Sequence, residues 1–297
     1  MRLILTFFSL CPLIVLSGAE PACCGEFTDS LGRRITLEGP PQRIVALAPS
    51  ITETLYYLGL GDRVVGVTQF SNFPPEAAFK PKVGTYVDVN VEKILTLSPD
   101  LVIGTKDGNE AEKVYLLDEA GIAAFIVNPR NVREAIETVA TVGRLCGIPD
   151  KGIALSLQLS KRVDDIVEKT RGRKRPLVFL QINLKPIMTV NKNTYLHDLI
   201  QLAGGENMTQ DEPITYPRIS LEEVIRKKAE VIIISSMDRG GQFEEAKREW
   251  ERWTTIPAVK NKRVHLVNSD LIDRPSPRIV EGLEMIARLL HPEVEWE

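Results

Sequence analysis

Two stretches of this chain, YVDVNVEKILTLSPDLVIGT (Tyr86 to Thr105) and YPRISLEEVIRKKAEVIIIS (Tyr216 to Ser235), follow the same pattern. Each has a tyrosine, a short polar residue and a glutamate at fixed spacing, then an apolar helical stripe and a β-branched run. Because Asn and Ser are good N-caps and each apolar run is short, both stretches predict a loop, a helix and a buried strand. The matched pairs are Tyr86 with Tyr216, Asn90 with Ser220, and Glu92 with Glu222. The repetition predicts two lobes of similar construction.

The composition of the 297-residue chain is ordinary for a globular protein, with 43% hydrophobic and 26% charged residues, and leaves room for two cores. The formal net charge is -3, slightly acidic, so we expect no nucleic-acid partner. The sequence contains no GxSxG, HExxH or P-loop motif, and we expect no enzyme. We also expect no directly bound metal, because His197, His265 and His291 share no ligand spacing and the cysteines form no CxxC pair.

Residues 1–19 have the basic start, short apolar run and small-residue end of a secretory signal, with cleavage expected after Ala19. Processing before Cys23, which would leave a lipid-anchored protein, is the alternative. Either route predicts an exported, periplasmic protein. Export would also allow disulfides, although the pairing of Cys146 cannot be read from the sequence.

Strands alternate with helices along most of the chain, which predicts mainly parallel sheets covered on both faces. An N-terminal segment (20–42) precedes the first α/β lobe (43–148), and the second α/β lobe follows at 174–297. Residues 149–173 carry no strand signal and predict one long rigid helix of about 30 Å, at ~1.5 Å per residue. The expected fold is therefore two α/β lobes joined by a helix, with a ligand cleft between them.

Two local motifs predict where helices begin. The residues Ser50-Ile-Thr-Glu53 have the pattern of a capping box, and Ser276 before Pro277 is expected to cap the closing helix. Further helices are expected at 110–120, 132–146, 194–203 and 243–253, and further strands at 43–48, 63–68, 122–127, 176–182 and 263–267.

Several runs carry a family pattern: RIVALAPSITETLYYLGLGDRVVGV (43–67), FSNFPPEA (70–77), FLQINLKP (179–186), AGGEN (203–207) and SDLIDRPSPR (269–278), together with the first copy of the repeat. In this order they resemble the helical-backbone (class III) periplasmic substrate-binding proteins of ABC importers, over nearly the whole mature chain. The resemblance implies a monomer that carries a small molecule to an importer's permease. It points to cobalamin or a related corrinoid, with a ferric siderophore or haem as the alternative ligand.

The resemblance also gives the paired glutamates a role. In the family each lobe presents one glutamate from an exposed helix start, and these grip arginines of the permease; Glu92 and Glu222 occupy those positions. A lone acid there would merely complement the helix dipole, worth about 0.3–1 kcal/mol, which does not account for identical placement on both lobes. A sensor or scavenger that binds its ligand without docking is the other hypothesis.

Family positions that contact the ligand match Ser50, Phe70, Tyr86, Tyr216, Asp270 and Arg274. Flat phenol rings suit a large macrocycle. Arg274 could bind an anionic group bidentately, or form a salt bridge with Asp270 or Asp273 instead. The chain departs from the family's cobalamin-binding pattern, which has tryptophan at the positions of Tyr86, Thr105, Tyr216 and Leu271. Smaller aromatic walls leave room for a different ligand.

Overall fold

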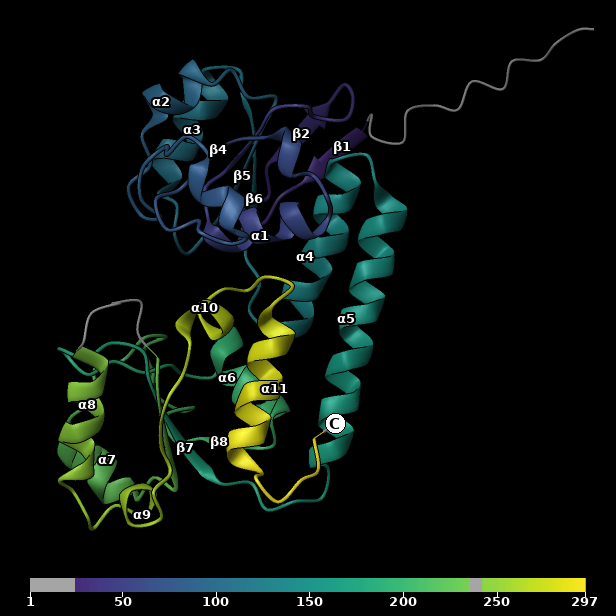
Figure 1. Cartoon of the computed structure of the whole chain (residues 1–297). Helices are drawn as coiled ribbons and strands as arrows, with labels where there is room; N and C mark the ends of the chain where they lie inside the picture. Colours follow the sequence, from purple (N-terminus) through teal and green to yellow (C-terminus); the bar gives the residue numbers. More distant parts are fainter. Residues whose placement is uncertain (1–24, 236–241, 297) are drawn as a thin grey trace, which may run out of the picture.

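The computed structural model describes residues 25–235 and 242–296; the expected signal (1–19) and the candidate lipid site at Cys23 lie outside this part of the chain. Two α/β lobes are stacked one above the other, and the long helix α5 (Pro149–Thr170) runs along one side of both (Figure 1). This confirms the fold class. The helix also confirms the expected connection between the lobes.

The upper lobe contains a parallel sheet with the strand order β4-β3-β5-β6. Its strands are β3 (Ile44–Ala46), β4 (Val64–Val67), β5 (Leu101–Thr105) and β6 (Ala123–Val127). Its helices are α1 (Pro49–Tyr57), α2 (Val91–Thr96), α3 (Ala111–Glu119) and α4 (Val132–Leu145), with 3-10 turns at Gly61–Arg63 and Pro75–Phe79. Alternate residues of β3 pack on opposite faces, Ile44 with α1 and α4, and Val45 with α2 and α3. Helices therefore cover both faces of this sheet.

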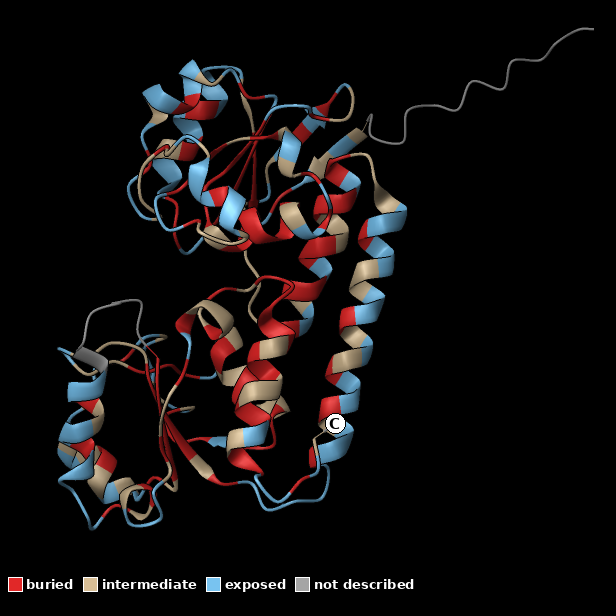
Figure 2. Cartoon of the chain, viewed as in Figure 1, coloured by how far each residue is buried: buried red, intermediate tan, exposed pale blue. Residues whose placement is uncertain are grey.

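The lower lobe repeats the arrangement with a parallel sheet of order β10-β9-β7-β8. Its strands are β7 (Leu177–Gln181), β8 (Glu206–Asn207), β9 (Val231–Ile234) and β10 (Val264–Leu266). Its helices are α6 (Tyr195–Leu202), α7 (Leu221–Lys227), α8 (Gln242–Glu251), α9 (Pro257–Lys260), α10 (Ser269–Ile272) and α11 (Ile279–Leu290). Val178 faces α6 and α11, whereas Phe179 packs with α7 and α8. Buried strands thus lie between helices in each lobe (Figure 2).

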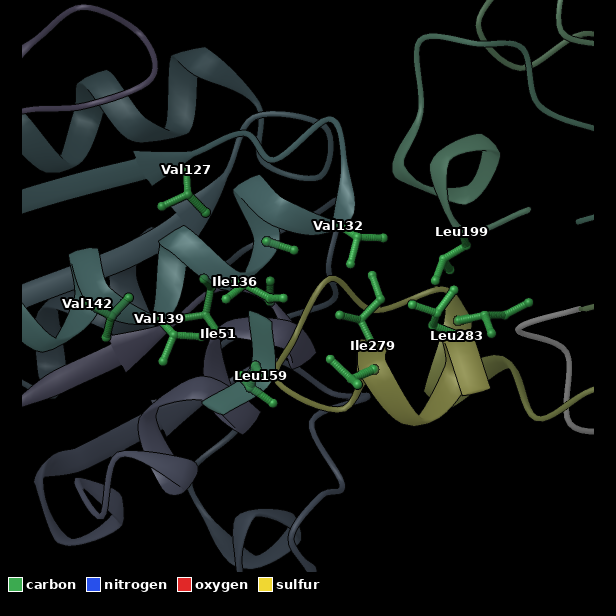
Figure 3. Close-up of a cluster of buried hydrophobic side chains, with 14 of the residues drawn as sticks. Ile51, Val127, Val132, Ile136, Val139, Val142, Leu159, Leu199, Ile279 and Leu283 are labelled. Atoms are coloured by element: carbon green, nitrogen blue, oxygen red, sulfur yellow. The ribbon is translucent and has the colours of Figure 1, made fainter. Parts of the chain in front are cut away.

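One hydrophobic core continues from the upper lobe into the lower one. It joins Ile51 of α1 and Ile136 of α4 to Leu199 of α6 and Leu283 of α11 (Figure 3). Helix α5 buries Leu159, Val163 and Ile166 against the same core, with the three- and four-residue spacing of one helical face. The lobes therefore share packed side chains in addition to the connecting helix, which makes their relative position stiff.

Helices α4 and α5 pack closely where two glycines meet. A Cβ atom on Gly143 would lie 2.8 Å from the Cα of Gly152, so the helix backbones are in direct contact. Along α5, Arg162 forms a salt bridge of 3.6 Å with Glu284 of α11. Within the described part of the chain, no helix is both long and apolar enough to cross a membrane.

The two copies of the repeat adopt the same structure, as predicted. Asn90 caps α2 by accepting a hydrogen bond from the Lys93 amide, and Ser220 caps α7 by accepting one from the Glu223 amide. The strands that follow, β5 and β9, are central in their sheets and are buried throughout.

Two predicted caps are wrong. Helix α1 begins at Pro49, so Ser50 and Glu53 are inside the helix and no side chain caps it. Helix α11 begins at Ile279 without a side-chain cap; the hydroxyl of Ser276 donates to Glu53, 2.5 Å away, and accepts from the Arg278 amide just ahead of the helix at 3.2 Å. Strand β8, helices α9 and α10, and the antiparallel hairpin of β1 (Gly25–Thr28) and β2 (Arg34–Leu37) were not predicted from the sequence.

Candidate ligand-binding site

The upper-lobe tyrosine of the repeat is fixed by its neighbours at the end of β5. The Thr105 hydroxyl donates to the Tyr86 hydroxyl oxygen at 3.0 Å, and the Asn109 side-chain amide donates to the Tyr86 carbonyl at 3.0 Å. The ring lies directly on Gly108, because a Cβ atom there would overlap the ring atoms. Burial raises the pKa of the Tyr86 hydroxyl, which stays protonated and can both donate and accept.

The lower-lobe tyrosine reaches across to the upper lobe. The Tyr216 hydroxyl donates to Asp107 at 3.3 Å, and Asp107 also accepts two hydrogen bonds of 2.8 Å from Arg130. Burial raises the pKa of Tyr216 to about 12, and the nearby Asp107 carboxylate adds to the shift. The two tyrosines of the repeat therefore meet around a single ion pair of the upper lobe.

A third tyrosine and a buried acid extend this surface along the lower lobe. The Tyr195 hydroxyl donates to the Asp273 carbonyl at 2.7 Å, and the Ser235 hydroxyl lies 3.0 Å from both carboxylate oxygens of Asp273. Burial raises the pKa of Asp273 to about 7, and the Asp270 carboxylate contributes. Burial raises the pKa of Tyr195 well above its ordinary value, with smaller contributions from Asp273, Tyr216 and Tyr86. The hydroxyls of Tyr86, Tyr195 and Tyr216 thus lie close to one another.

A separate cluster of charged residues surrounds Arg274, which is only 8% exposed. It forms salt bridges with Asp270 at 2.7 Å and with Glu53 at 2.8 Å. Its guanidinium also donates to the Phe70 carbonyl at 3.2 Å. The salt-bridge alternative for Arg274 therefore holds in this structure, with Asp270 as one of two acidic partners.

The remaining expected site residues differ in accessibility. Phe70, which follows β4, is 52% exposed, whereas Ser50 is 4% exposed inside α1. Phe70 can therefore offer an apolar surface to a ligand, and Ser50 can offer very little. Residues 236–241, which follow Ser235 at the end of β9, lie outside the described part of the chain.

Sequence reasoning missed Asp107, Arg130, Tyr195, Ser235 and Asp273. Asp107 and Ser235 follow the central strands of the two sheets, and the carboxyl ends of parallel strands are common ligand positions. That rule could have found both. The others come from helix starts and loops whose meeting depends on how the lobes are stacked.

A pocket of about 610 Å³ opens between the lobes, next to the ion pair of Asp107 and Arg130. Arg130 and Asn131 line it from the upper lobe, and residues 192–194, His197, Asp198 and Thr215 line it from the lower lobe. Because Arg130 also binds Asp107, the pocket borders the tyrosine pair.

The paired glutamates lie on a separate surface. Glu92 and Glu222 are exposed at the second residue of α2 and of α7, two helices on the side of the molecule away from α5 (Figure 1). Hydrogen bonds from its own backbone amide and from Ser220 lower the pKa of Glu222, so it is charged at neutral pH. Glu92 borders a cavity of about 930 Å³ together with the exposed side chain of Leu95.

The two lobes share a core and place aromatic and charged groups at their junction. A family model described as "Periplasmic binding protein" matches residues 44–271. The chain therefore belongs to the periplasmic binding protein family, whose members bind substrates for ABC transport and are not enzymes.

Individual relatives agree with this assignment. The vitamin B12-binding protein of Vibrio cholerae is 30% identical over 252 residues, covering 84% of this chain and 90% of the relative. An uncharacterized ABC transporter substrate-binding lipoprotein of Bacillus subtilis is 30% identical over 272 residues, covering 89% and 85%.

Solved structures show the same fold. The crystal structure of the periplasmic vitamin B12-binding protein of Vibrio cholerae matches with a TM-score of 0.78 and 29% identity, covering 85% of this chain and 98% of that one. A periplasmic heme-binding protein of Roseiflexus matches with a TM-score of 0.76 and 25% identity, covering 86% and 99%.

Proposed function

We propose that this protein binds cobalamin or a related corrinoid between its lobes and delivers it to the permease of an ABC importer. The observation that carries the proposal is the placement of Tyr86 and Tyr216. They stand at equivalent positions of two repeated units, and both lie near Asp107 of the upper lobe. Two phenol faces at the junction suit a large flat ring that both lobes contact.

The charges at the site favour a corrinoid over the alternative ligands. Among the described residues, Arg130 is already paired with Asp107, and Arg274 with Asp270 and Glu53. Haem presents two carboxylates and many siderophores are anionic, so both would have to compete with acids for Arg130 and Arg274, which leaves the exposed Lys192, 3.4 Å from Asp211, as the more accessible cation at the pocket. A corrinoid carries neutral amides around its ring, and phenols and carboxylates are good partners for amide N–H groups.

The relatives support the same ligand class. Two comparisons point to vitamin B12-binding proteins of Vibrio cholerae, whereas the heme-binding structure shares less of its sequence with this chain. The phenols of Tyr86 and Tyr216, in place of larger indoles, leave room for a corrinoid other than cobalamin itself. For this reason the proposal extends to related corrinoids.

The docking partner is proposed from the paired glutamates. Glu92 and Glu222 lie at the same position of two helices on one side of the molecule. Permease arginines that bind one glutamate on each lobe would set the orientation of the complex. Exposed charge pairs of this kind contribute little affinity but raise the association rate, which suits a carrier that must dock and leave.

The cellular location is proposed from the same relatives. Relatives of this chain include periplasmic proteins and a lipoprotein, which supports export. The signal at 1–19, with a lipid anchor at Cys23 as the alternative, remains the proposed route. The continuous core between the lobes predicts a rotation of only a few degrees on ligand binding.

Calorimetric titration with cyanocobalamin tests the ligand. We expect saturable one-to-one binding that weakens about ten-fold or more in Tyr86→Ala and in Tyr216→Ala. Tyr115→Ala is the control, because Tyr115 is 54% exposed on α3, a helix on the outer face of the upper sheet. Binding of haem or a ferric siderophore without binding of cyanocobalamin would retain the transport role and overturn the ligand. Equal effects of all three substitutions would overturn the site.

A further inference from the structure

Glu53 is a fully buried carboxylate at the junction between the lobes. Its Oε1 accepts from Arg274 at 2.8 Å and from Arg278 at 3.4 Å, and its Oε2 accepts from Ser276 at 2.5 Å. Glu53 belongs to α1 of the upper lobe, whereas its three partners lie between α10 and α11 of the lower lobe. A buried charge is tolerated only when it is paired and hydrogen-bonded in this way, so the contact fixes the lobes relative to each other.

The two arginines also hold the loop that carries Phe70. Arg274 donates to the Asn72 side chain at 2.9 Å and to the Phe70 carbonyl at 3.2 Å. The guanidinium of Arg278 lies 3.9 Å over the ring of Phe73, a cation–π contact. Loop 70–73 of the upper lobe is therefore anchored by side chains of the lower lobe.

Arg274 has little capacity left for a ligand. The terminal nitrogens of an arginine carry four N–H donors. In this structure Nη1 contacts Glu53 and Asn72, and Nη2 contacts Phe70 and Asp270. Three hydrogen bonds and the Asp270 ion pair thus engage both terminal nitrogens, and a ligand would have to displace a protein group to bind there.

We propose that Glu53, Arg274 and Arg278 form an inter-lobe clamp that orients Phe70 and Asp270 toward the ligand. The three clamp residues are positioning residues, and Arg274 acts through Phe70 and Asp270 without binding the ligand itself. This inference rests on the proposed ligand site for its effect on binding, but the clamp's effect on the loop is independent of any ligand.

Glu53→Gln tests the clamp, because it removes the charge and keeps the shape. The hydrogen exchange of the Gln69 and Ser71 amides, which bond the Gly84 and Thr68 carbonyls, reports on the loop without a ligand. We expect exchange at both amides to accelerate about ten-fold or more. Arg278→Lys, measured alongside, keeps the charge but loses the planar stacking group and should accelerate the same amides.

Val163→Ala is the matched control. Val163 is buried in α5, so its truncation destabilises the protein through a cavity, away from the loop. When the variant and the wild type are each measured at the same temperature interval below their own unfolding midpoint, the exchange rates of the Gln69 and Ser71 amides should agree within about two-fold. Unchanged exchange in Glu53→Gln, or equal acceleration in Val163→Ala, would overturn the clamp.

Titration with cyanocobalamin then tests the orienting role. Glu53→Gln should raise Kd about ten-fold or more, and this effect should shrink to about two-fold when Phe70→Ala and Asp270→Asn are both present, because the clamp acts through these two residues. Val163→Ala should leave Kd unchanged. Additivity between Glu53→Gln and the paired Phe70→Ala and Asp270→Asn substitutions would overturn the orienting role. Absence of cyanocobalamin binding to the wild type would instead overturn the proposed ligand, and the exchange experiment would still decide the clamp.

Discussion

Substitution of Gly108 by alanine tests whether Tyr86 is held at the lobe junction as described. A methyl group on Gly108 would overlap the Tyr86 ring, which therefore has to leave its position. The ring cannot simply slide, because Asn109 holds the Tyr86 carbonyl and Thr105 holds its hydroxyl. We expect Gly108→Ala to displace the phenol while leaving the docking helices untouched.

The expected loss of stability follows from the packing and the hydrogen bond that displacement of the Tyr86 ring would disrupt. Overpacking of this kind costs about 1–3 kcal/mol, and the lost Thr105–Tyr86 hydrogen bond contributes about 0.5–1.5 kcal/mol within that range. The free energy of unfolding, measured by urea denaturation, should fall by about 1–3 kcal/mol. Because Tyr86 is half-buried and part of the proposed site, Kd for cyanocobalamin should rise about ten-fold, equivalent to about 1.4 kcal/mol.

A double-mutant cycle separates this cause from a general effect of alanine at Gly108. In a Tyr86→Ala background the ring is absent, so Gly108→Ala should cost less than about 0.5 kcal/mol. Gly39→Ala is the control substitution, since a Cβ there would meet no atom within 4 Å. The reasoning is refuted if Gly108→Ala costs the same with and without the Tyr86 ring.

Three further predictions concern the docking face, a buried acid and the contact between α4 and α5. Replacing both Glu92 and Glu222 with alanine should leave Kd unchanged and lower cellular uptake of labelled cobalamin roughly ten-fold or more; unchanged uptake would favour a sensor or scavenger. Asp273 has a folded-state pKa of about 7, raised from 3.8, so between these values only the unfolded state gives up the proton and stability falls as pH rises. Relative to Asp273→Asn, the wild type should lose up to about 4 kcal/mol of unfolding free energy between pH 4 and pH 8, and parallel pH profiles of the two proteins would contradict the assignment. Gly143→Ala should cost about 1–3 kcal/mol by urea denaturation, since its methyl group would meet the α5 backbone 2.8 Å away, and a neutral effect would contradict the close helix contact.

Local sequence patterns predicted most of the fold correctly. The Asn90 and Ser220 caps, the buried strands after them and the helix expected at 149–173 depend on neighbours a few residues apart, and the structure has all of them, with the helix ending at Thr170. The Ser50–Glu53 pattern misled because Pro49 is well suited to the first helical turn and moves the helix start ahead of the expected cap. Glu53 then falls deeper in the helix, on its buried side.

The site was predictable only in part, because its contacts join distant residues. Asp107 and Tyr216 are separated by 109 positions, and Glu53 and Arg274 by 221. Periodicity and capping report on a few turns of chain and carry no information about which loops meet when two lobes stack. The resemblance to a family supplied Tyr86 and Tyr216, but it could not show that Arg274 is occupied by protein partners.

The anomalous scattering of cobalt in crystals grown with cyanocobalamin tests the central claim most directly. The proposal predicts one strong cobalt peak between the lobes, bounded by Tyr86 of the upper lobe, Tyr216 of the lower lobe and Phe70. A peak elsewhere on the molecule, or saturating cyanocobalamin with no ordered cobalt, would contradict a corrinoid site at the lobe junction.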